Sequence, residues 1–543
     1  MAGDVETLLR QFGTIEDRRR NWESWWQQIA ERVLPAEAQF TTTDQEGNKR
    51  SERIFTGKPI IDNERFAAVM DELLTPRTQM WHALGPEDDE LQEDQAVKEY
   101  LERVNKLLFT SRYRPRANFA SQKHQGYMSV GAFGNSCMYI DEEIGRGPRY
   151  RSIHLKEVFW CEDHTGRIDT IYRKFELEKR QAEKRAAEEG WQLPKQILEE
   201  KDPYKKFCFL HAVMPNEERV ASRQDYRGMP WASYYIVPEY KAMVKAGGYT
   251  SWPYAIGRYA LAASEAYGRS PAMTAWGAIL TLNEEKKTIL RAGQKEVDPP
   301  VLLQEDGVLD AFNLRPGALN YGAMSMDGTP LAQAFKTGAN IPLGLELMGL
   351  EQMEIEEAFL VSIFKILAEH PQMTATQVLE ITQQKATLLA PMMGRQQSED
   401  LGPLIEREID ILSRDSRNSW MLEDMPESLR ERGGAYKIEY RSPLARAMRA
   451  QDGVAIVRTF EALPAAVQID PDSALVIDVP ASLRELAEIN GVPAKLVRDK
   501  DTVAQMVADK AERDQAAQMA AVAPEMSQAA LNAAKAESLR AGA

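Results

Sequence analysis

The sequence predicts an α+β fold that is mainly helical, and three patterns lead to this prediction. Apolar residues recur at three- and four-residue spacing through the first 35 residues, as in an amphipathic helix. Between residues 136 and 237 the period shortens to that of strands. Beyond residue 270, two long helical segments enclose a short stretch rich in Gly, Pro and Asn. The length of 543 residues predicts about two to four structural units.

Composition and cysteine usage exclude several classes of protein. Hydrophobic residues make up 43% of the chain, which argues against wholesale disorder. The three cysteines, Cys137, Cys161 and Cys208, are too few and too widely spaced for a disulfide framework, so we expect an intracellular protein. The strongest apolar run, residues 358–368, is about half as long as a bilayer requires and contains Lys365. We therefore expect a soluble protein without membrane contact.

Net charge restricts any contact with nucleic acid. The chain has 67 Lys and Arg against 82 Asp and Glu, a formal charge of −15. Proteins that bind DNA tightly through its phosphates usually have a basic surplus. Contact with DNA, if it occurs, is expected to be local, loose or repulsive.

The first 135 residues predict three helices. Trp22, Trp25 and Trp26 lie on one helical stripe that Pro35 ends, and core packing is the favoured role of each tryptophan. Asp62 or Asn63 is expected to cap a second helix that stops before residue 76. The acidic stretch 87–94 opens a third helix, where acids suit the helix dipole, so this charge run needs no ligand.

Short strands follow, with one charged helix among them. Strands are expected around residues 137–139, 150–160 and 168–175, and again over 206–213 and 231–237. Residues 164–167 read as a turn. A helix from Leu177 to about Glu189 ends at Gly190, the residue type favoured just beyond a helix. The first 250 residues are therefore predicted to be α+β.

The middle of the chain predicts a helical hairpin. Ser270 and Pro271 have the form of an N-cap followed by proline in the first turn, and this helix is expected to reach about Glu296. A second helix is predicted over 343–369. The intervening tip cannot bury its own apolar residues, so we expect strand edges there to pair between chains; these residues are Val301, Leu302, Leu303 and Phe312.

The C-terminal part predicts further helices. Thr374 and Gln377 fit a capping box that starts a helical run towards residue 414. Pro391 removes a hydrogen bond from that run, so the helix must kink or break near Ala390. A strand is expected over 436–440, then helices to about residue 509 and an Ala-rich tail over 511–543.

Motifs for catalysis are absent from the sequence. No phosphate loop, dinucleotide fingerprint, His-Glu-x-x-His or Gly-x-Ser-x-Gly motif occurs. Cys161 and His164 have the spacing of half a zinc site, with His154 nearby, but no second half exists. We therefore predict no catalytic residue, no metal site and no cofactor, as in a structural or mechanical protein.

Four groups of residues occur in a characteristic order. Residues 66–84 contain FAA, LTP and WHAL; residues 267–300 contain YGRSPA, TLN and VDPP; residues 374–378 are TATQV; and residues 440–447 are YRSPLARA. Together they resemble the portal, or head-to-tail connector, proteins of short-tailed double-stranded DNA bacteriophages over nearly the whole chain. One departure is Thr56-Gly57-Lys58, where that family more often has an Asp-Ser/Thr pair.

The resemblance implies a portal fold that assembles into a ring, usually of twelve subunits, around a central channel. In the family's order the chain divides into an N-terminal wing (1–265), a stem helix (266–296), a clip (297–328), a returning stem helix (329–368), a tunnel loop (369–373), a long kinked wing helix with the C-terminal part of the wing (374–470), and a crown with the Ala-rich tail (471–543).

The resemblance also implies a function without bond chemistry. The ring would lie at one capsid vertex of the virion, after assembly in the host cytoplasm, and pass the genome in and out. Its partners would be double-stranded DNA, the terminase large subunit, tail adaptors, and capsid or scaffolding proteins. DNA-facing residues are expected at Lys365, Glu369, His370 and Gln372. Clip contacts are expected at Val301, Leu302, Leu303, Phe312 and Arg315.

The charge of the returning helix fits a conduit. Residues 331–370 hold two lysines and six glutamates. Such a wall would let DNA slide rather than bind it, although a solvated helix face explains the same balance equally well. Two other classes stay open: a metal-dependent hydrolase that uses the acidic cluster, and a helical scaffold or adaptor that forms no ring.

Overall fold

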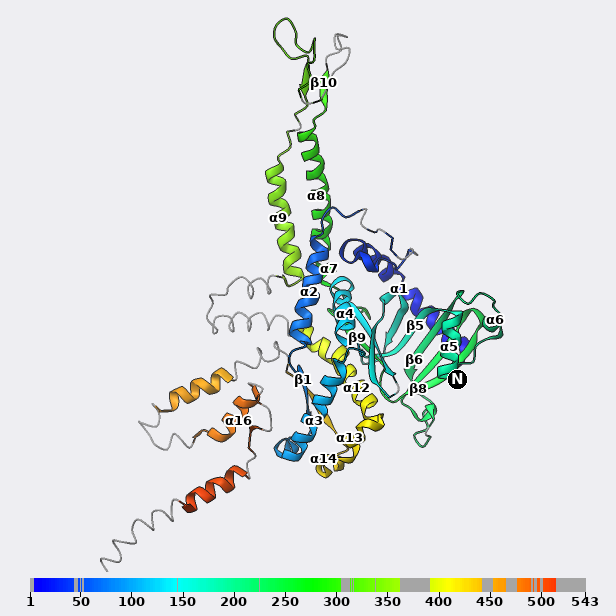
Figure 1. Ribbon diagram of the computed structural model, residues 1–543, viewed down its shortest axis with the longest axis vertical. Coiled ribbons are helices and arrows are strands. Elements are labelled where there is room, and N and C mark those ends of the chain that lie inside the picture. Colours follow the sequence, from blue (N-terminus) through cyan, green and yellow to red (C-terminus); the bar gives the residue numbers. More distant parts are fainter. Residues whose placement is uncertain are drawn as a thin grey trace, which may run out of the picture. The chain divides into compact units, whose positions relative to one another are not determined.

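The computed structural model describes residues 4–42, 47–48, 50, 53–143, 145–223, 225–303, 313, 315, 317–336, 338–361, 391–441, 453–464, 476–489, 492, 496–498 and 502–513. These residues form two compact units. Unit 1 comprises residues 1–81 and 108–419, and unit 2 comprises residues 82–107 and 420–543. Helices and strands occur in both, so the predicted α+β class is confirmed (Figure 1).

A five-stranded antiparallel sheet forms one part of unit 1. Its strands pair in sequence order: β4 (Val158–Glu162), β5 (Ile168–Glu178), β6 (Lys206–Pro215), β7 (Trp231–Val237) and β8 (Ala242–Tyr249). The turn predicted at residues 164–167 joins β4 to β5, where the Asp163 carboxylate accepts hydrogen bonds from the N–H groups of Thr165 and Arg167. The predicted strands of this sheet are confirmed, except that Leu155–Glu157 form a 3-10 turn before β4, and β8 is an additional strand.

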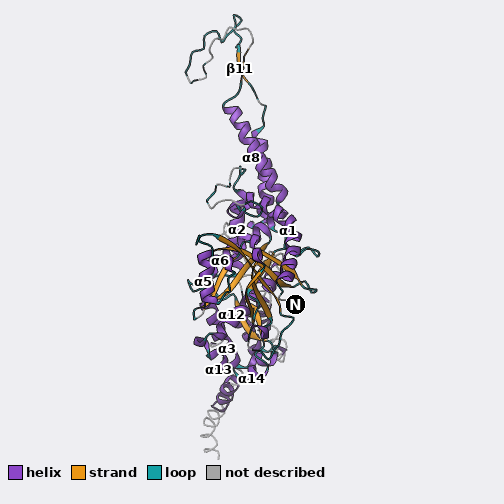
Figure 2. Cartoon of the chain, turned by 90° about the vertical axis from the view of Figure 1, so that its right-hand side faces the viewer, coloured by secondary structure: helices purple, strands orange, loops and turns teal. Residues whose placement is uncertain are grey.

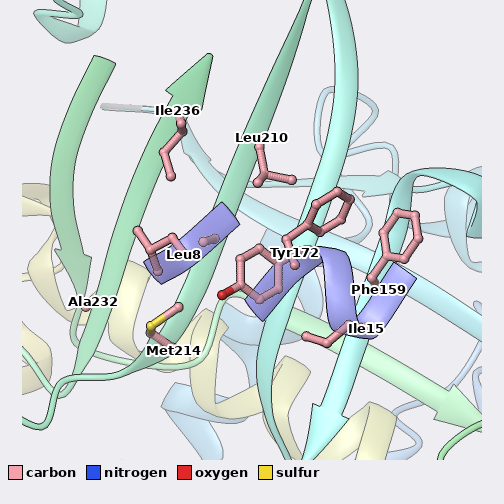
Figure 3. Packing of buried hydrophobic residues seen from close by; sticks show 10 residues of the cluster. Leu8, Ile15, Phe159, Tyr172, Leu210, Met214, Ala232 and Ile236 are labelled. Carbon is pink, nitrogen blue, oxygen red and sulfur yellow. The ribbon is translucent and has the colours of Figure 1, made fainter. Parts of the chain in front are cut away.

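Helix α1 (Val5–Val33) covers one face of this sheet. Its Leu8, Phe12 and Ile15 pack against apolar side chains that alternate along the strands, as Figure 3 shows. The sheet contributes Phe159, Tyr172, Leu210, Ala212, Met214, Ala232 and Ile236. The helix ends before Pro35, as predicted. Further along α1, Trp26 is fully buried, which supports its interpretation as a core residue.

The opposite face of the sheet is covered by α5 (Lys179–Glu189) and α6 (Lys195–Leu198). Ala182 and Ile197 pack there with Trp191 and the strand residues Phe209 and Tyr235. The C-cap Gly190 has a left-handed conformation (φ 72°), which explains why glycine ends this helix. With both faces covered, the sheet is a layer inside the unit.

A second sheet, in the order β3-β2-β9, lies against α4 (Phe119–Phe133). Its strands are β2 (Asn135–Glu143), β3 (Gly147–Ser152) and β9 (Tyr254–Arg258). Helix α2 (Lys58–Leu74) packs on α4, where a side chain on Gly131 would collide with Asn63 and Phe66. The prediction that Asp62 or Asn63 caps α2 was wrong, because the helix begins one turn earlier at Lys58, with Pro59 in its first turn, and both residues are buried inside it.

Two long helices and a small ribbon follow. Ser270 caps the short α7 (Pro271–Thr274), and α8 (Trp276–Val297) continues after a break at Ala275. Strand β10 (Val301–Leu303) pairs antiparallel with β11 (Ala332–Ala334), and Figure 2 shows β11 beyond the end of α8. Helix α9 (Ile341–Ala358) then packs along α8 (Figure 1).

The expected continuation of α9 to residue 369 was wrong within the described residues. The helix ends at Ala358 because Leu360 adopts a left-handed conformation (φ 59°), while Phe359 is buried against Phe66. Residues 362–390, which include the predicted capping box and the kink at Ala390, lie outside the described part of the chain.

Residues 391–414 are helical in the described part of the chain, and the helix passes Pro403 without breaking. Residues Gln396–Leu401 form a π-helix, followed by α12 (Gly402–Arg414). Pro403 cannot donate the usual hydrogen bond, and the widened turn before it keeps the chain helical. Buried ion pairs hold this segment in unit 1: Asp400 contacts Lys123, and Glu408 contacts Arg112.

Unit 2 pairs two segments that are distant in sequence. Strand β1 (His82–Pro86) is antiparallel to β12 (Tyr436–Tyr440), the strand that the sequence predicts. The acidic stretch forms a 3-10 turn, Asp89–Glu93, before α3 (Gln95–Arg112), whose last residues belong to unit 1. Shorter helices are α13 (Trp420–Glu423), α14 (Glu427–Glu431) and α16 (Val479–Ile489), and residues 453–464 and 502–513 are also helical.

Across the described residues, each helix is too short or too polar to serve as a membrane span.

Candidate functional site: the helical hairpin and its base

The α8–α9 hairpin joins the sheets of unit 1 through residues 267–271. Asn135 binds this segment with both side-chain groups, since its Oδ1 accepts from the Gly268 N–H at 2.7 Å and its Nδ2 donates to the Gly268 carbonyl at 3.0 Å. A Cβ on Gly268 would lie 2.6 Å from the carbonyl oxygen of Gly134. Only glycine fits this crossing of two backbones.

The residues beside Gly268 fix the direction of the hairpin. Tyr267 is buried among Trp22, Trp26 and Trp160, with ring centroids 4.5–5.9 Å apart. Ser270 accepts a hydrogen bond from the Met273 N–H at 3.0 Å and so caps α7. The motif YGRSP, singled out in the sequence, is therefore a structural joint between sheet and hairpin.

Polar contacts hold the base of both hairpin helices. The Lys58 ammonium lies 2.9 Å from Asp62 Oδ1 within α2 and 2.5 Å from Glu356 Oε1 on α9. Burial raises the pKa of Asp62, although the neighbouring Lys58 acts in the opposite direction. On α8, Asn283 accepts from the Phe55 N–H at 2.9 Å and donates to the Arg53 carbonyl at 3.1 Å. Lys58 belongs to Thr56-Gly57-Lys58, where this sequence departs from the portal pattern.

Beyond its base the hairpin exposes large apolar side chains. Five residues of α9 are 45–58% exposed, namely Leu343, Leu345, Leu347, Leu350 and Met353. On α8, Leu290 is 46% exposed. Apolar area of this extent on packed helices is typical of a surface that another protein covers.

One side of the hairpin is hollowed into a groove of about 570 Å³. Its lining comes from both helices: Leu280, Thr281, Glu284, Glu285, Thr288 and Ile289 of α8, with Gly344 and Leu347 of α9. Oxygen Oε2 of Glu285 is buried and has no hydrogen-bond partner among the described residues. Burial and the nearby Glu351 carboxylate raise the pKa of Glu285.

Charge is divided unevenly between the two helices. Helix α9 has five glutamates and no lysine or arginine, whereas α8 has four basic residues, Lys286, Lys287, Arg291 and Lys295. Lys287 pairs with Glu284 at 2.9 Å. Lys286, Arg291 and Lys295 form no ion pair with other described residues.

The predicted clip residues that the structure describes are exposed or half-buried. Leu302 and Leu303 of β10 are each 55% exposed, Val301 is half-buried, and Arg315 is exposed. Phe312 lies outside the described residues, as do the predicted DNA-facing residues Lys365, Glu369, His370 and Gln372.

No cluster of three or more His, Cys, Asp or Glu residues suited to a metal ion occurs within the described ranges. Of the half-site considered from the sequence, His164 is exposed. The Nε2 atom of His154 lies 3.0 Å from the Glu37 carbonyl oxygen. Burial raises the pKa of the Cys161 thiol to about 11, which disfavours the thiolate that binds zinc.

Comparison with known proteins gives a family and two relatives. The family "Bacteriophage head to tail connecting protein" matches residues 5–497. A "Probable portal protein" of Bordetella phage BPP-1 is 27% identical over 512 residues, which cover 93% of this chain and 91% of the relative. A "Portal protein" of Salmonella phage epsilon15 is 23% identical over 517 residues, covering 94% and 92%.

Among solved structures, a chain described as "Virion of native gene transfer agent (GTA) particle" matches with a TM-score of 0.33 and 13% identity. The match covers 80% of this chain and 95% of that chain.

Proposed function

The chain belongs to the family of bacteriophage proteins that connect head to tail, and from this premise we propose that it is a portal: a ring of identical subunits at one capsid vertex of the virion, through which the genome enters and leaves. The two phage relatives, both named as portal proteins, support this role over more than nine-tenths of the chain. The work of such a protein is mechanical, so no catalytic residue is assigned.

The exposed apolar surface of α9 is the main observation that supports a ring. A helix with five large apolar residues at 45–58% exposure is poorly suited to a monomer in water. Side-by-side hairpins, each covering the next, would bury this surface and leave no end uncovered when the ring closes. The strand edges of β10 and β11 would gain partners in the same way.

The experiment is native mass spectrometry with electron microscopy of the purified full-length chain. We expect a closed ring with a central hole, of twelve subunits as in the family. A chain that stays monomeric at every concentration and salt condition would contradict the portal and favour the non-ring scaffold. Metal-dependent hydrolysis of DNA would favour the hydrolase.

Within the ring, α9 and the residues after it are proposed to line the DNA channel. Helix α9 carries five glutamates and no cation of its own, and Glu356 pairs with Lys58 of α2. The other four glutamates would repel phosphates, so DNA could slide past without the counterion release that strengthens binding. Lys365, Glu369, His370 and Gln372 would be the residues closest to DNA, in a tunnel loop over 369–373.

Replacing Lys365 and His370 by Ala tests the channel assignment. We expect rings to form as before, with retention of packaged DNA reduced several-fold because two contacts with phosphate are lost. The measurement is DNA per particle after packaging and after storage. Unchanged retention with both substitutions would remove these residues from the channel while leaving the ring itself unaffected.

The tip is proposed to be the clip that docks the terminase large subunit during packaging and tail adaptors afterwards. The exposed Leu302, Leu303 and Arg315 supply apolar and basic contacts for such partners. In the same scheme residues 1–265 form the wing, and residues 374–470 complete it. The crown, residues 471–543, would contact capsid or scaffolding proteins.

A further inference from the structure

The groove between α8 and α9 is incomplete within a single chain. Its walls are apolar at Leu280, Ile289 and Leu347, yet it holds a carboxylate oxygen of Glu285 without a hydrogen-bond partner in the described structure. The Glu285 side chain is half-buried, and leaving its buried oxygen unpaired has a desolvation cost. The groove therefore fits an occupant that brings apolar side chains together with a cation.

The opposite side of the same hairpin has this combination. Successive α-helical residues are about 100° apart, so Lys286 and Leu290, one turn from each other, share the face of α8 turned away from the groove. Leu345 lies on the corresponding side of α9, opposite Leu347. Leu290 and Leu345 are 46% and 53% exposed, and Lys286 has no ion-pair partner among the described residues.

Both sides lie at the same level of the hairpin. A Cβ on Gly344 would contact the Ile289 side chain, so residues 289 and 344 are level with each other. Leu290 and Leu345 follow these residues directly, and Lys286 follows Glu285. A rotation about an axis that runs along the hairpin keeps levels unchanged, so it brings one side of a subunit against the other side of its neighbour.

We propose that the groove receives a second copy of this chain, with Leu290, Leu345 and Lys286 of one subunit against the apolar wall and Glu285 of the next. This contact rests on the proposed ring and specifies its partner surfaces. It is heterologous, because the two surfaces differ, and it repeats at each junction of a closed ring. Pairing with Lys286 would supply the missing partner of the Glu285 carboxylate.

The test reverses these two charges in the full-length chain. Glu285→Lys places two cations at each junction, and Lys286→Glu places two carboxylates there. We expect either single variant to need at least about tenfold more protein to form rings, because like charges then meet at each contact. The double variant Glu285→Lys/Lys286→Glu restores opposite charges and is expected to assemble like the unmodified chain.

Mixing the two single variants separates contact between copies from an effect inside one copy. In the mixture, Lys at position 285 of one variant meets Glu at position 286 of the other, so rings should form at ordinary concentration with both variants in equal amounts. Native mass spectrometry reads this composition directly. Failure of the mixture to assemble better than either variant alone would overturn the inference.

Lys184→Glu is the matched control, since it makes the same charge change on α5, which packs on the five-stranded sheet and is not part of the hairpin. Lys184 pairs with Glu188 at the surface, and such pairs contribute little to stability. This variant should form rings at ordinary concentration. If it also loses its rings, the assembly defect of the other variants comes from the change in net charge and not from the proposed contact. Absence of rings in the unmodified chain would instead refute the portal itself.

Discussion

Buried polar side chains connect the two sheets of unit 1, and His211 of β6 lies at their centre. Its ring stacks on Tyr235 with centroids 4.1 Å apart. Nδ1 lies 2.9 Å from the Tyr254 hydroxyl and Nε2 lies 3.0 Å from the Ser233 hydroxyl. Burial lowers the pKa of His211 well below its usual value, and nearby Arg173 and Arg185 act in the same direction.

A neutral His211 makes the fold sensitive to acid. In the unfolded chain the imidazole titrates near pH 6.5, so below that pH the unfolded state binds one proton more than the folded state. The stability contribution is therefore complete above pH 6.5 and is lost as the pH falls towards the depressed pKa. His211→Gln should flatten the decline between pH 6.5 and 4.5 by up to about 1.4 kcal/mol per pH unit.

Denaturant unfolding across this pH range measures the slope for each variant. His164→Gln is the control, since it removes an exposed imidazole from the turn between β4 and β5. If both variants flatten the curve equally, the effect does not come from the buried ring. If His211→Gln keeps the original slope, the neutral state assigned to His211 is wrong.

Among the helices and strands, the joint at residues 267–271 determines where the α8–α9 hairpin begins relative to the sheets of unit 1. Gly268 crosses Gly134, Tyr267 lies in the tryptophan cluster, and Ser270 starts α7. Each contact joins residues more than 100 positions apart or caps a helix. A substitution at this joint would therefore shift the hairpin although it changes no residue of α8 or α9.

Gly268→Ala is predicted to destabilise unit 1 by about 1–3 kcal/mol, because the new Cβ would lie 2.6 Å from a backbone oxygen that cannot rotate away. Thermal unfolding measures the loss. The matched control is Gly277→Ala in α8, where nothing lies within 4 Å of the new methyl group, so helix propensity should raise stability by up to about 1 kcal/mol. Equal effects at the two positions would contradict the close crossing.

Elements with a clear period could be predicted from the sequence. The strand Tyr436–Tyr440, the cap at Ser270 and the end of α1 before Pro35 all follow local rules, and they are confirmed. Helix α4 was missed because its residues are buried on several sides, which removes the amphipathic stripe that reveals a helix.

The groove could not be predicted for a different reason. It depends on the register between α8 and α9, which places Gly344 opposite Ile289 and Glu285 near Glu351. Those pairs are more than 50 residues apart, and no local pattern encodes them. The uneven charge of the two helices was visible in the sequence, but only the hairpin geometry relates it to a partner.

For the whole molecule, the structure shows where part of the negative charge lies. Helix α9 holds five glutamates, while α8 carries Lys286, Arg291 and Lys295, which form no ion pair with other described residues. A ring built from such hairpins could use α8 cations for subunit contacts and α9 carboxylates to keep DNA unbound. The overall charge of −15 is then compatible with DNA passage and unfavourable for DNA binding.

Substitutions in strand β10 at the tip of the hairpin should weaken the ring without lowering the stability of the single subunit. Leu302 and Leu303 are each 55% exposed in the single chain, so replacing both by Ser removes little buried area and should change its unfolding by less than about 0.5 kcal/mol. In the ring the same substitutions remove apolar area at every subunit contact, so rings should dissociate at a clearly lower denaturant concentration. Sedimentation velocity measures the ring fraction.

Leu198→Ser, at a 51% exposed leucine of α6, is the control and should leave rings intact. Rings that survive the double substitution unchanged would show that the tip leucines face solvent or a different partner rather than a neighbouring subunit.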